Sequence, residues 1–304
     1  MSVPNFRLAA ALAGKLPLLV VAVSVSACIG GGSEAKRLRL SCEDGNAADC
    51  LELGVRLEAG DRVLQDPIHA ASRFQQACDG GVAEGCYRLA RMHGDGRGVD
   101  GDSMLAVSLF QQACDGGEMQ GCASLGDMYQ DGEGVPQDSA RAAGMFQQAC
   151  DGGGMPGCTK LGVIYQLGGG IDQDVARAAS LFQQACDGEH AEGCSNLGVL
   201  YANGEGVAQD LSRAAGLYEQ ACDSDHAEGC FNLGAMYATG AGVTQDFEQA
   251  TSLYDQACDG NHAEGCFRIA EMYATGTGVP RDLSRAARIF RRACRLGYEE
   301  ACAR

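Results

Sequence analysis

The apolar positions of the chain repeat at the spacing of short amphipathic helices. In the stretch that begins at residue 191, Leu197 and Tyr201 follow Cys194 by three and seven positions. That spacing places the three side chains on one face of a helix. Gly204 and Gly206 come next, and glycine readily adopts the left-handed conformation found at helix ends. We therefore predict a first helix that ends near residue 204.

A second helix is predicted after this glycine-containing loop. Asp210 is a candidate N-cap, because its side chain can accept hydrogen bonds from the free backbone N–H groups of the first turn. The helix predicted over 211–222 carries Ala214, Tyr218 and Cys222 on one face, again at helical spacing. The two helices and their loop form an antiparallel helical hairpin.

The same pattern recurs every 36 residues without insertion or deletion. Its clearest marker is a pair of cysteines separated by seven residues, here called the cysteine bracket. A fixed period of this size is typical of stacked repeats, in which neighbouring units bury one continuous core. The eight brackets are Cys42–Cys50, Cys78–Cys86, Cys114–Cys122, Cys150–Cys158, Cys186–Cys194, Cys222–Cys230, Cys258–Cys266 and Cys294–Cys302.

The period predicts an all-α fold, an α/α superhelical solenoid of antiparallel helical hairpins. Residues 36–304 are expected to form a single solenoid with seven full repeats and terminal half-units. The repeats lie at 47–82, 83–118, 119–154, 155–190, 191–226, 227–262 and 263–298. We expect the first repeat to be a degenerate cap, because it lacks the Gly-x-Gly loop and carries Pro67 where its second helix starts.

The brackets also predict eight disulfides. The chain has 17 cysteines, far more than a protein of a reducing compartment usually carries without bound metal. Two cysteines eight positions apart across a tight turn can approach within the ~7 Å Cα separation that a disulfide requires. Metal binding is the alternative, although zinc-binding cysteines are typically only about two to four residues apart. We expect each bracket to close on itself, which leaves Cys28 as the unpaired cysteine.

Residues 1–27 resemble the signal peptide of a bacterial lipoprotein. Two basic residues precede an apolar run that is too short to span a bilayer, and the run ends in Val-Ser-Ala before Cys28. We expect cleavage before Cys28, lipidation of its thiol, and a flexible tether over residues 28–35. The alternative is ordinary cleavage that leaves Cys28 as a free thiol.

Location and charge restrict the partners. Ile29 stands where, in lipoprotein families, an aspartate marks retention in the inner membrane, so we expect an exported envelope protein, an outer-membrane lipoprotein that faces the periplasm or the surface. The formal net charge of −17 argues against nucleic acid as a partner, because an acidic surface repels phosphates. We expect a monomer that meets the membrane through its lipid anchor.

The repeat motif resembles a known family. It reads Cys-x2-Leu-Gly-x2-Tyr, then Gly-x-Gly-Val-x-x-Asp, then Ala-x3-Phe/Tyr-x-x-Ala-Cys. This motif is similar to the Sel-1-like repeat, a relative of the tetratricopeptide repeat, and the bracket is similar to the Helicobacter cysteine-rich protein subgroup. The resemblance covers residues 36–304 and implies a scaffold that binds a protein or an extended peptide. It also implies an alternative, weak β-lactam binding or hydrolysis, which is described for some members of the subgroup.

We identify no catalytic residue, no metal site and no cofactor from the sequence. Ser33 and Lys36 match the Ser-x-x-Lys spacing of serine β-lactamases but lie at the predicted tether, and Ser-Asp-Asn and Lys-Thr-Gly motifs are absent. His190, His226 and His262 recur at 36-residue intervals, which places them in different helix layers, too far apart to share one metal ion. We interpret them as turn residues. A purely structural envelope spacer is a third alternative.

The binding hypothesis selects one surface. In tetratricopeptide-type arrays the first helices line the concave face, and their non-core positions contact ligands. Here these positions lie two, five and nine residues after the first-helix cysteine, which makes one stripe by helical spacing. The candidate groove residues at the first of these positions are Arg88, Ser124, Lys160, Asn196, Asn232 and Arg268. Asn196 and Asn232 match the position where tetratricopeptide domains hold a peptide backbone or carboxylate; a solvated helix face is the alternative for each.

The last repeat differs from the others in charge. Its second helix carries arginines where the other repeats carry Gln, Asp and Glu: Arg281, Arg285, Arg288, Arg291, Arg292 and Arg295. One interpretation is a polar cap that keeps the exposed end of the array soluble. The other is a basic surface that docks an acidic partner or the acidic body of a second molecule.

Overall fold

The computed structural model describes residues 34–304, in which the regular elements are α-helices. The predicted signal peptide, Cys28 and most of the predicted tether lie outside the described residues. A helical segment over residues 34–43 precedes the first repeat. No helix in this described part is both long enough and apolar enough to cross a membrane.

Each repeat contributes two helices of 13 residues. The first helices are α2 (Ala47–Ala59), α4 (Ala83–Asp95), α6 (Met119–Asp131), α8 (Met155–Leu167), α10 (Ala191–Asn203), α12 (Ala227–Thr239) and α14 (Ala263–Thr275). The second helices are α3 (Pro67–Asp79), α5 (Ser103–Asp115), α7 (Ser139–Asp151), α9 (Val175–Asp187), α11 (Leu211–Asp223), α13 (Phe247–Asp259) and α15 (Leu283–Arg295). A short helix, α16 (Glu299–Cys302), follows the last repeat.

The helices begin and end at the predicted capping residues. The side chain of Asp210 accepts a hydrogen bond from the backbone N–H of Arg213 at the start of α11. At the end of α10, Gly204 has a φ of 72°, in the left-handed region. The second helix predicted over 211–222 extends one residue further, to Asp223. Similar caps recur in the other repeats, so the helices have equal lengths.

The first repeat keeps the loop shape of the others despite its different sequence. Gly60 ends α2 at a φ of 74°, and Arg62 has a φ of 57° where the later repeats place their second loop glycine. A side chain in this conformation is strained, which explains why the other repeats use glycine there. Pro67 occupies the first turn of α3, where proline costs no hydrogen bond. The expected cap is therefore a regular hairpin.

The core lies between the two helices of each repeat and continues into the next repeat. Phe74, Phe146 and Phe182 of the second helices are fully buried, as are Leu161 and Leu197 of the first helices. Each second helix packs both against the first helix of its own repeat and against the first helix of the next one. The apolar core therefore runs along the whole array, as a repeat architecture requires.

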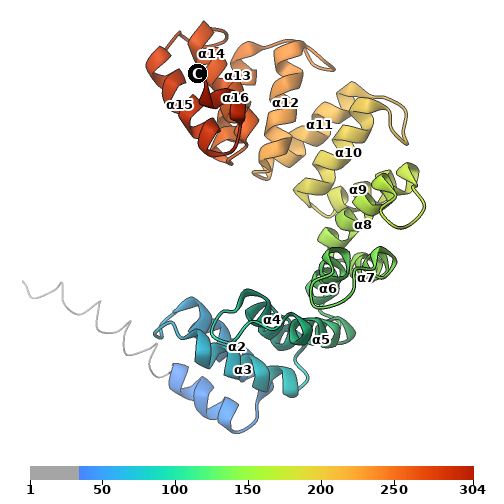
Figure 1. Cartoon of the computed structure of the whole chain (residues 1–304), viewed down its shortest axis with the longest axis vertical. Helices are drawn as coiled ribbons and strands as arrows, with labels where there is room; N and C mark the ends of the chain where they lie inside the picture. The colour runs from blue at the N-terminus through green and yellow to red at the C-terminus, as the bar shows by residue number, and fades with distance from the viewer. Residues whose placement is uncertain (1–33) are drawn as a thin grey trace, which may run out of the picture.

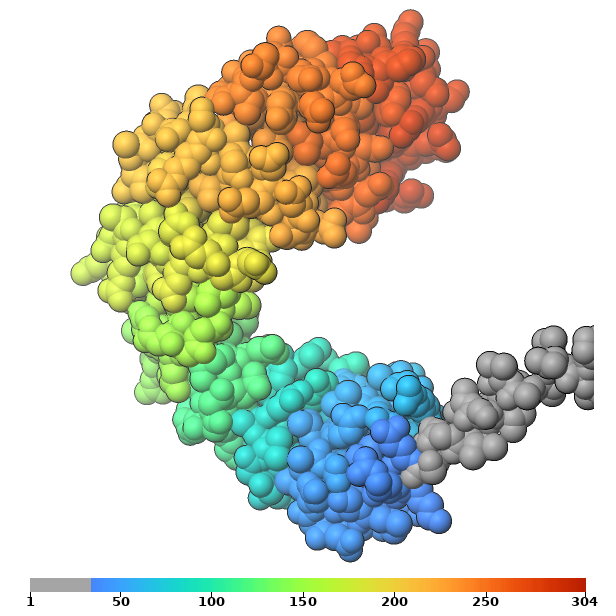
Figure 2. Space-filling view, turned by 180° about the vertical axis from the view of Figure 1, so that it is seen from behind, coloured from blue at the N-terminus to red at the C-terminus, as the bar shows by residue number. Residues whose placement is uncertain are grey.

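The array curves toward its first helices. α6, α8, α10 and α12 contact one another in succession, whereas the second helices in the described part of the chain make no contact of that extent with each other. The inner face is therefore lined by first helices. Figure 1 shows the described chain as an open arc, and Figure 2 shows from behind how the layers at its two ends stand apart across the opening.

All eight cysteine brackets are closed by disulfides. The Cα–Cα distances lie between 4.4 Å for Cys258–Cys266 and 4.8 Å for Cys294–Cys302, within the usual disulfide range. Each bracket joins the end of one second helix to the start of the next first helix. The predicted fold class, a solenoid of helical hairpins stapled by disulfides within the brackets, is confirmed.

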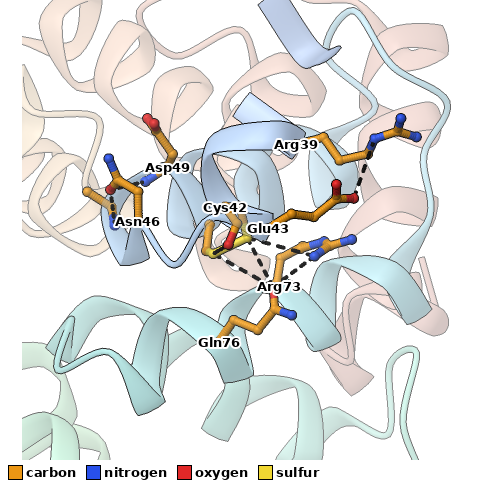
Figure 3. Close-up of a disulfide and its surroundings, with 9 residues drawn as sticks. Arg39, Cys42, Glu43, Asn46, Asp49, Arg73 and Gln76 are labelled. Carbon is orange, nitrogen blue, oxygen red and sulfur yellow. Dashed lines mark hydrogen bonds and ion pairs between the residues drawn. A yellow bond between two sulfur atoms is a disulfide. The ribbon is translucent and has the colours of Figure 1, made fainter. Parts of the chain in front are cut away.

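A glutamine of the following second helix lies against four of the eight brackets. The side-chain oxygen of Gln76 is 3.0 Å from Sγ of Cys42, and Arg73 donates a hydrogen bond to the same oxygen over 2.8 Å. Figure 3 shows Gln76 and Arg73 pointing toward this disulfide from α3. The same contact recurs for Gln220, whose oxygen is 3.4 Å from Sγ of Cys186. The disulfides thus also contribute to packing between layers.

Candidate peptide-binding surface

The predicted stripe lies on the side of the first helices that faces away from the second helices. In α10, Leu197 is 1% exposed, whereas Asn196 and Val199 are only partly covered. Because the array curves toward the first helices, this stripe lies on the concave face. We call the positions two, five and nine residues after the first-helix cysteine, in α4 to α14, the concave stripe.

Two members of the concave stripe meet across neighbouring layers. The Nζ of Lys160 on α8 lies 2.8 Å from Oδ1 of Asp127 on α6, and both side chains are 42% exposed. Ser124 of α6 lines the same cavity as this ion pair. The structure therefore brings the predicted residues Ser124 and Lys160 together, with Asp127 as the partner of the lysine.

The cavity beside this pair has a volume of about 250 Å³. We call it the α6/α8 socket, and its lining includes Tyr87, Met119, Ala123, Ser124, Pro156 and Lys160. Most of these groups are apolar, while the ammonium of Lys160 and the carboxylate of Asp127 stand at the rim. The socket can accept an apolar side chain and offers charged hydrogen-bonding groups beside it.

A second cavity opens on the same stripe near the other end of the array. We call it the α12/α14 socket; its volume is about 420 Å³, and its lining includes Phe231, Ala235, Phe247, Tyr254, Arg268 and Met272. The guanidinium of Arg268 is held by Glu264 at 2.7 Å and by Glu271 at 3.4 Å. Like the first socket, it has apolar walls and a cation–carboxylate pair at the rim, but it lies toward the C-terminal ends of its first helices, whereas the α6/α8 socket lies toward the N-terminal ends.

The two predicted asparagines lie between these sockets. Asn196 is on α10 and Asn232 is on α12, and both are partly exposed. Within residues 34–304, neither carboxamide makes a hydrogen bond to another group of the protein. A carboxamide has both donors and an acceptor, which is the set needed to bind a peptide unit. The remaining predicted residue, Arg88, is held by Glu84 at 2.8 Å and Glu58 at 3.4 Å.

The recurring histidines are turn residues that contact the preceding layer. Nδ1 of His190 lies 2.9 Å from Oγ1 of the buried Thr159, and burial lowers the pKa of this imidazole. The ring of His262 stacks on Phe231 at a centroid distance of 4.4 Å, and its Nε2 lies 3.7 Å from Oε2 of Glu228. Within residues 34–304, no three His, Cys, Asp or Glu side chains are grouped as a metal site would need.

The basic last helix is partly neutralised by the preceding repeat. Arg292 lies 3.0 Å from Asp259, and Arg285 lies 3.4 Å from Asp255 while covering the ring of Tyr273 at 4.2 Å. These contacts join α15 to α13 and α14, so part of the arginine cluster stabilises the end of the array. Both interpretations of the remaining arginines, a solubilising cap and a docking surface, stay predictions.

The sockets were not found by sequence analysis. Their walls come from the residue after each first-helix cysteine, for example Tyr87 and Phe231, and from second-helix aromatics such as Tyr254. The sequence gives one indication of the sockets: the side chain after the first-helix cysteine varies in size, being Tyr, Ala, Thr, Ser or Phe in successive repeats from α4 onward. Turning that variation into a cavity requires knowing which side chains face each other across layers.

The family comparison matches the repeats one by one. The Sel1 repeat matches residues 47–82, 83–118, 120–154, 156–190, 191–226, 227–262 and 263–298. Together these segments cover most of the described chain. No curated protein sequence gives a match.

Solved structures show the same architecture. The protective antigen c5321 of uropathogenic Escherichia coli strains, described as displaying an SLR fold, superposes with a TM-score of 0.76 at 28% identity. The match covers 88% of this chain but 57% of that protein, so the chain spans little more than half its length. A Sel1 repeat protein from Oxalobacter formigenes has a TM-score of 0.70 at 18% identity, over 80% of this chain and 96% of that one. Cysteine rich protein B of Helicobacter pylori is 27% identical over 43% of this chain and 94% of its own, with a TM-score of 0.37.

Proposed function

Since the chain belongs to the Sel1 repeat family, we propose that it is a scaffold that binds an extended peptide segment of a partner protein along the concave stripe. The observation that carries this proposal is the pair of unbonded carboxamides, Asn196 and Asn232, on the same inner face as two cavities. Unbonded polar groups beside apolar cavities are the usual composition of a ligand-binding surface.

The compartment supports a partner outside the cytoplasm. Eight closed disulfides indicate an oxidising, extracytoplasmic environment. Lipidation of Cys28 and attachment to the outer membrane are part of the proposal. If both are correct, cells fed a labelled fatty acid should label the parent protein and not the Cys28→Ser variant.

The binding proposal is tested by capture from intact cell envelopes. We expect crosslinking to yield partners with the parent protein and to lose them when Lys160, Asn196, Asn232 and Arg268 are all replaced by alanine. The matched control replaces Ser108, Ser180 and Ser252, which are exposed at equivalent positions on second helices, by alanine. The proposal is falsified if every captured partner still binds the fourfold stripe variant.

A further inference from the structure

We propose that the concave stripe selects extended peptides that carry two large apolar residues about seven to nine positions apart, one for each socket. This inference rests on the proposed function and adds a ligand class to it. It follows from three features of the inner face: the likeness of the sockets, their separation, and the groups between them.

The two sockets have the same chemistry. Tyr87 and Met119 supply the apolar wall of the α6/α8 socket, and Phe231 and Met272 supply that of the α12/α14 socket. Their volumes, about 250 and 420 Å³, are large enough for one leucine, phenylalanine or tyrosine side chain each. Apolar walls bind apolar side chains, because removing both surfaces from water is favourable.

The rims and the net charge define the polar character of the ligand. Lys160 is paired with Asp127, and Arg268 is paired with Glu264 and Glu271, so neither rim presents an uncompensated cation. The whole chain has a formal net charge of −17. An acidic peptide is therefore repelled and a cationic peptide is attracted, while a neutral peptide meets no net electrostatic repulsion.

The distance between the sockets sets the spacing of the two apolar residues. The socket between α6 and α8 and the one between α12 and α14 are three repeats apart. Neighbouring helices pack about 8–10 Å apart, so three steps between successive first helices amount to roughly 27 Å across the array. The sockets also lie toward opposite ends of their first helices, which makes the path between them somewhat longer. An extended peptide advances about 3.3 Å per residue, which makes roughly eight residues between the two anchors.

The surface between the sockets is suited to a peptide backbone. Asn196 and Asn232 occupy the same position in consecutive first helices, α10 and α12, and their carboxamides are unbonded. One repeat corresponds to about three residues of extended chain at these spacings. The two asparagines can therefore bind two peptide units of the segment that joins the anchors, whatever side chains that segment carries.

The experiment uses a display library of random linear peptides selected against the oxidised full chain, followed by synthetic peptides. These place two phenylalanines about four, eight or twelve residues apart in a neutral polar background. We expect the eight-residue spacing to bind at least about tenfold more tightly than the other two, measured by fluorescence anisotropy. Equal affinities for all three spacings would overturn the inference.

Failure of the inference and failure of the proposed function give different results. If selected peptides lose binding in the Asn196→Ala, Asn232→Ala variant but show no preferred spacing, the scaffold function stands and the two-socket inference is wrong. If no peptide is selected, or if peptides bind the stripe variant unchanged, the proposed function fails. Light scattering could also show that the protein self-associates through the stripe and that peptide does not affect this association. That result would contradict both the proposed function and the two-socket inference.

Filling the sockets provides a test within the protein. Ser124→Trp and Ala235→Trp place a large side chain in the α6/α8 and α12/α14 sockets, and Ala176→Trp on the exposed side of α9 is the control. Each socket variant should weaken the two-anchor peptide about tenfold, while the control should not. The affinity of a peptide that lacks one phenylalanine should not change when the corresponding socket is filled. A misfolded variant would instead lose affinity for every peptide, so this comparison separates blocked binding from misfolding.

Discussion

The Cα of Gly162 on α8 faces the buried ring of Phe182 on α9, and a Cβ at position 162 would lie 2.5 Å from a ring carbon. The ring is fully buried. The same relationship holds for Gly126 and Phe146, also at 2.5 Å. The glycine at this position of α6 and α8 therefore allows the close packing of these two hairpins.

We predict that Gly162→Val lowers the stability of the array. Overpacking a tight core typically costs roughly 1–3 kcal/mol. The matched control is Gly144→Val in α7, where a Cβ would have no heavy atom of a neighbouring group within 4 Å; it should change stability little, because valine is no worse than glycine in a helix. Thermal unfolding followed by circular dichroism measures both. Equal melting temperatures for the two variants would contradict the packing argument.

The central disulfides should stabilise the array mainly through the unfolded chain. Cys186 and Cys194 are eight residues apart, so their bond closes a short loop, worth roughly 2–3 kcal/mol in the chain-entropy model. We predict that replacing both by alanine lowers the free energy of unfolding by about this amount, plus the loss of two buried side chains. Urea denaturation measures the change.

The terminal disulfide provides the comparison for this prediction. Cys294–Cys302 closes a loop of the same length, but Cys302 is exposed and belongs to the four-residue helix α16. Replacing this pair should release α16 without separating two halves of the array, because each repeat contacts only its neighbours. If the variant that lacks the Cys186–Cys194 disulfide has the same urea unfolding midpoint as the parent, the bracket contributes nothing to stability.

Arg213 joins two helices of one repeat to the preceding layer. Its guanidinium lies 4.3 Å from the ring centroid of Tyr201 and donates a hydrogen bond to Gln183 over 3.0 Å. We predict that Arg213→Lys lowers stability by about 0.5–1 kcal/mol, because a lysine ammonium loses the planar stacking and the fork of donors.

Arg141 is the control for this substitution. Its guanidinium is 5.6 Å from the ring centroid of Tyr129, and its ion pair with Asp138 is exposed and local. Arg141→Lys should therefore cost less than Arg213→Lys in thermal unfolding experiments at low salt. A reversed order would show that the cation–ring distance does not set the energy.

The fold was predictable because its signals are local and repeated. The cysteine period, the cap at Asp210 and the glycine at 204 each depend on residues within one repeat, and the structure has all of them. Left-handed Arg62 was not predicted, because the loop shape is imposed by the neighbouring helices rather than by its own residues.

The candidate surface was predictable in position but not in chemistry. Helical spacing places Lys160 on the inner face, but its pairing with Asp127 joins residues 33 apart, which depends on how successive layers are stacked. Each socket depends on the volumes of facing side chains from three helices, and no single repeat encodes it.

His190 and Glu228 make the array sensitive to acid in two separate pH ranges. Burial lowers the pKa of the His190 imidazole below its usual value of 6.5, and Lys160 and His226 add to this while Glu192 opposes it. The neighbouring His262 imidazole, whose Nε2 lies 3.7 Å from Oε2 of Glu228, lowers the pKa of the Glu228 carboxyl below its usual value of 4.5. In both cases the unfolded chain takes up its proton at a higher pH than the folded one, so stability falls as the pH decreases through each range.

We predict that His190→Gln removes the loss of stability in the higher pH range, which depends on His190, and leaves the loss in the lower range, which depends on Glu228. The parent melting temperature should decrease as the pH falls below about 6.5, where a protonated imidazole is disfavoured beside buried Thr159. The glutamine variant should show a flatter profile in that range, because it has no proton to take up, and should still lose stability below about 4.5, where Glu228 is protonated. Melting temperatures measured from pH 7.5 to 3.5 distinguish these ranges. An unchanged slope between pH 7 and 5 in the variant would show that His190 is not the group responsible.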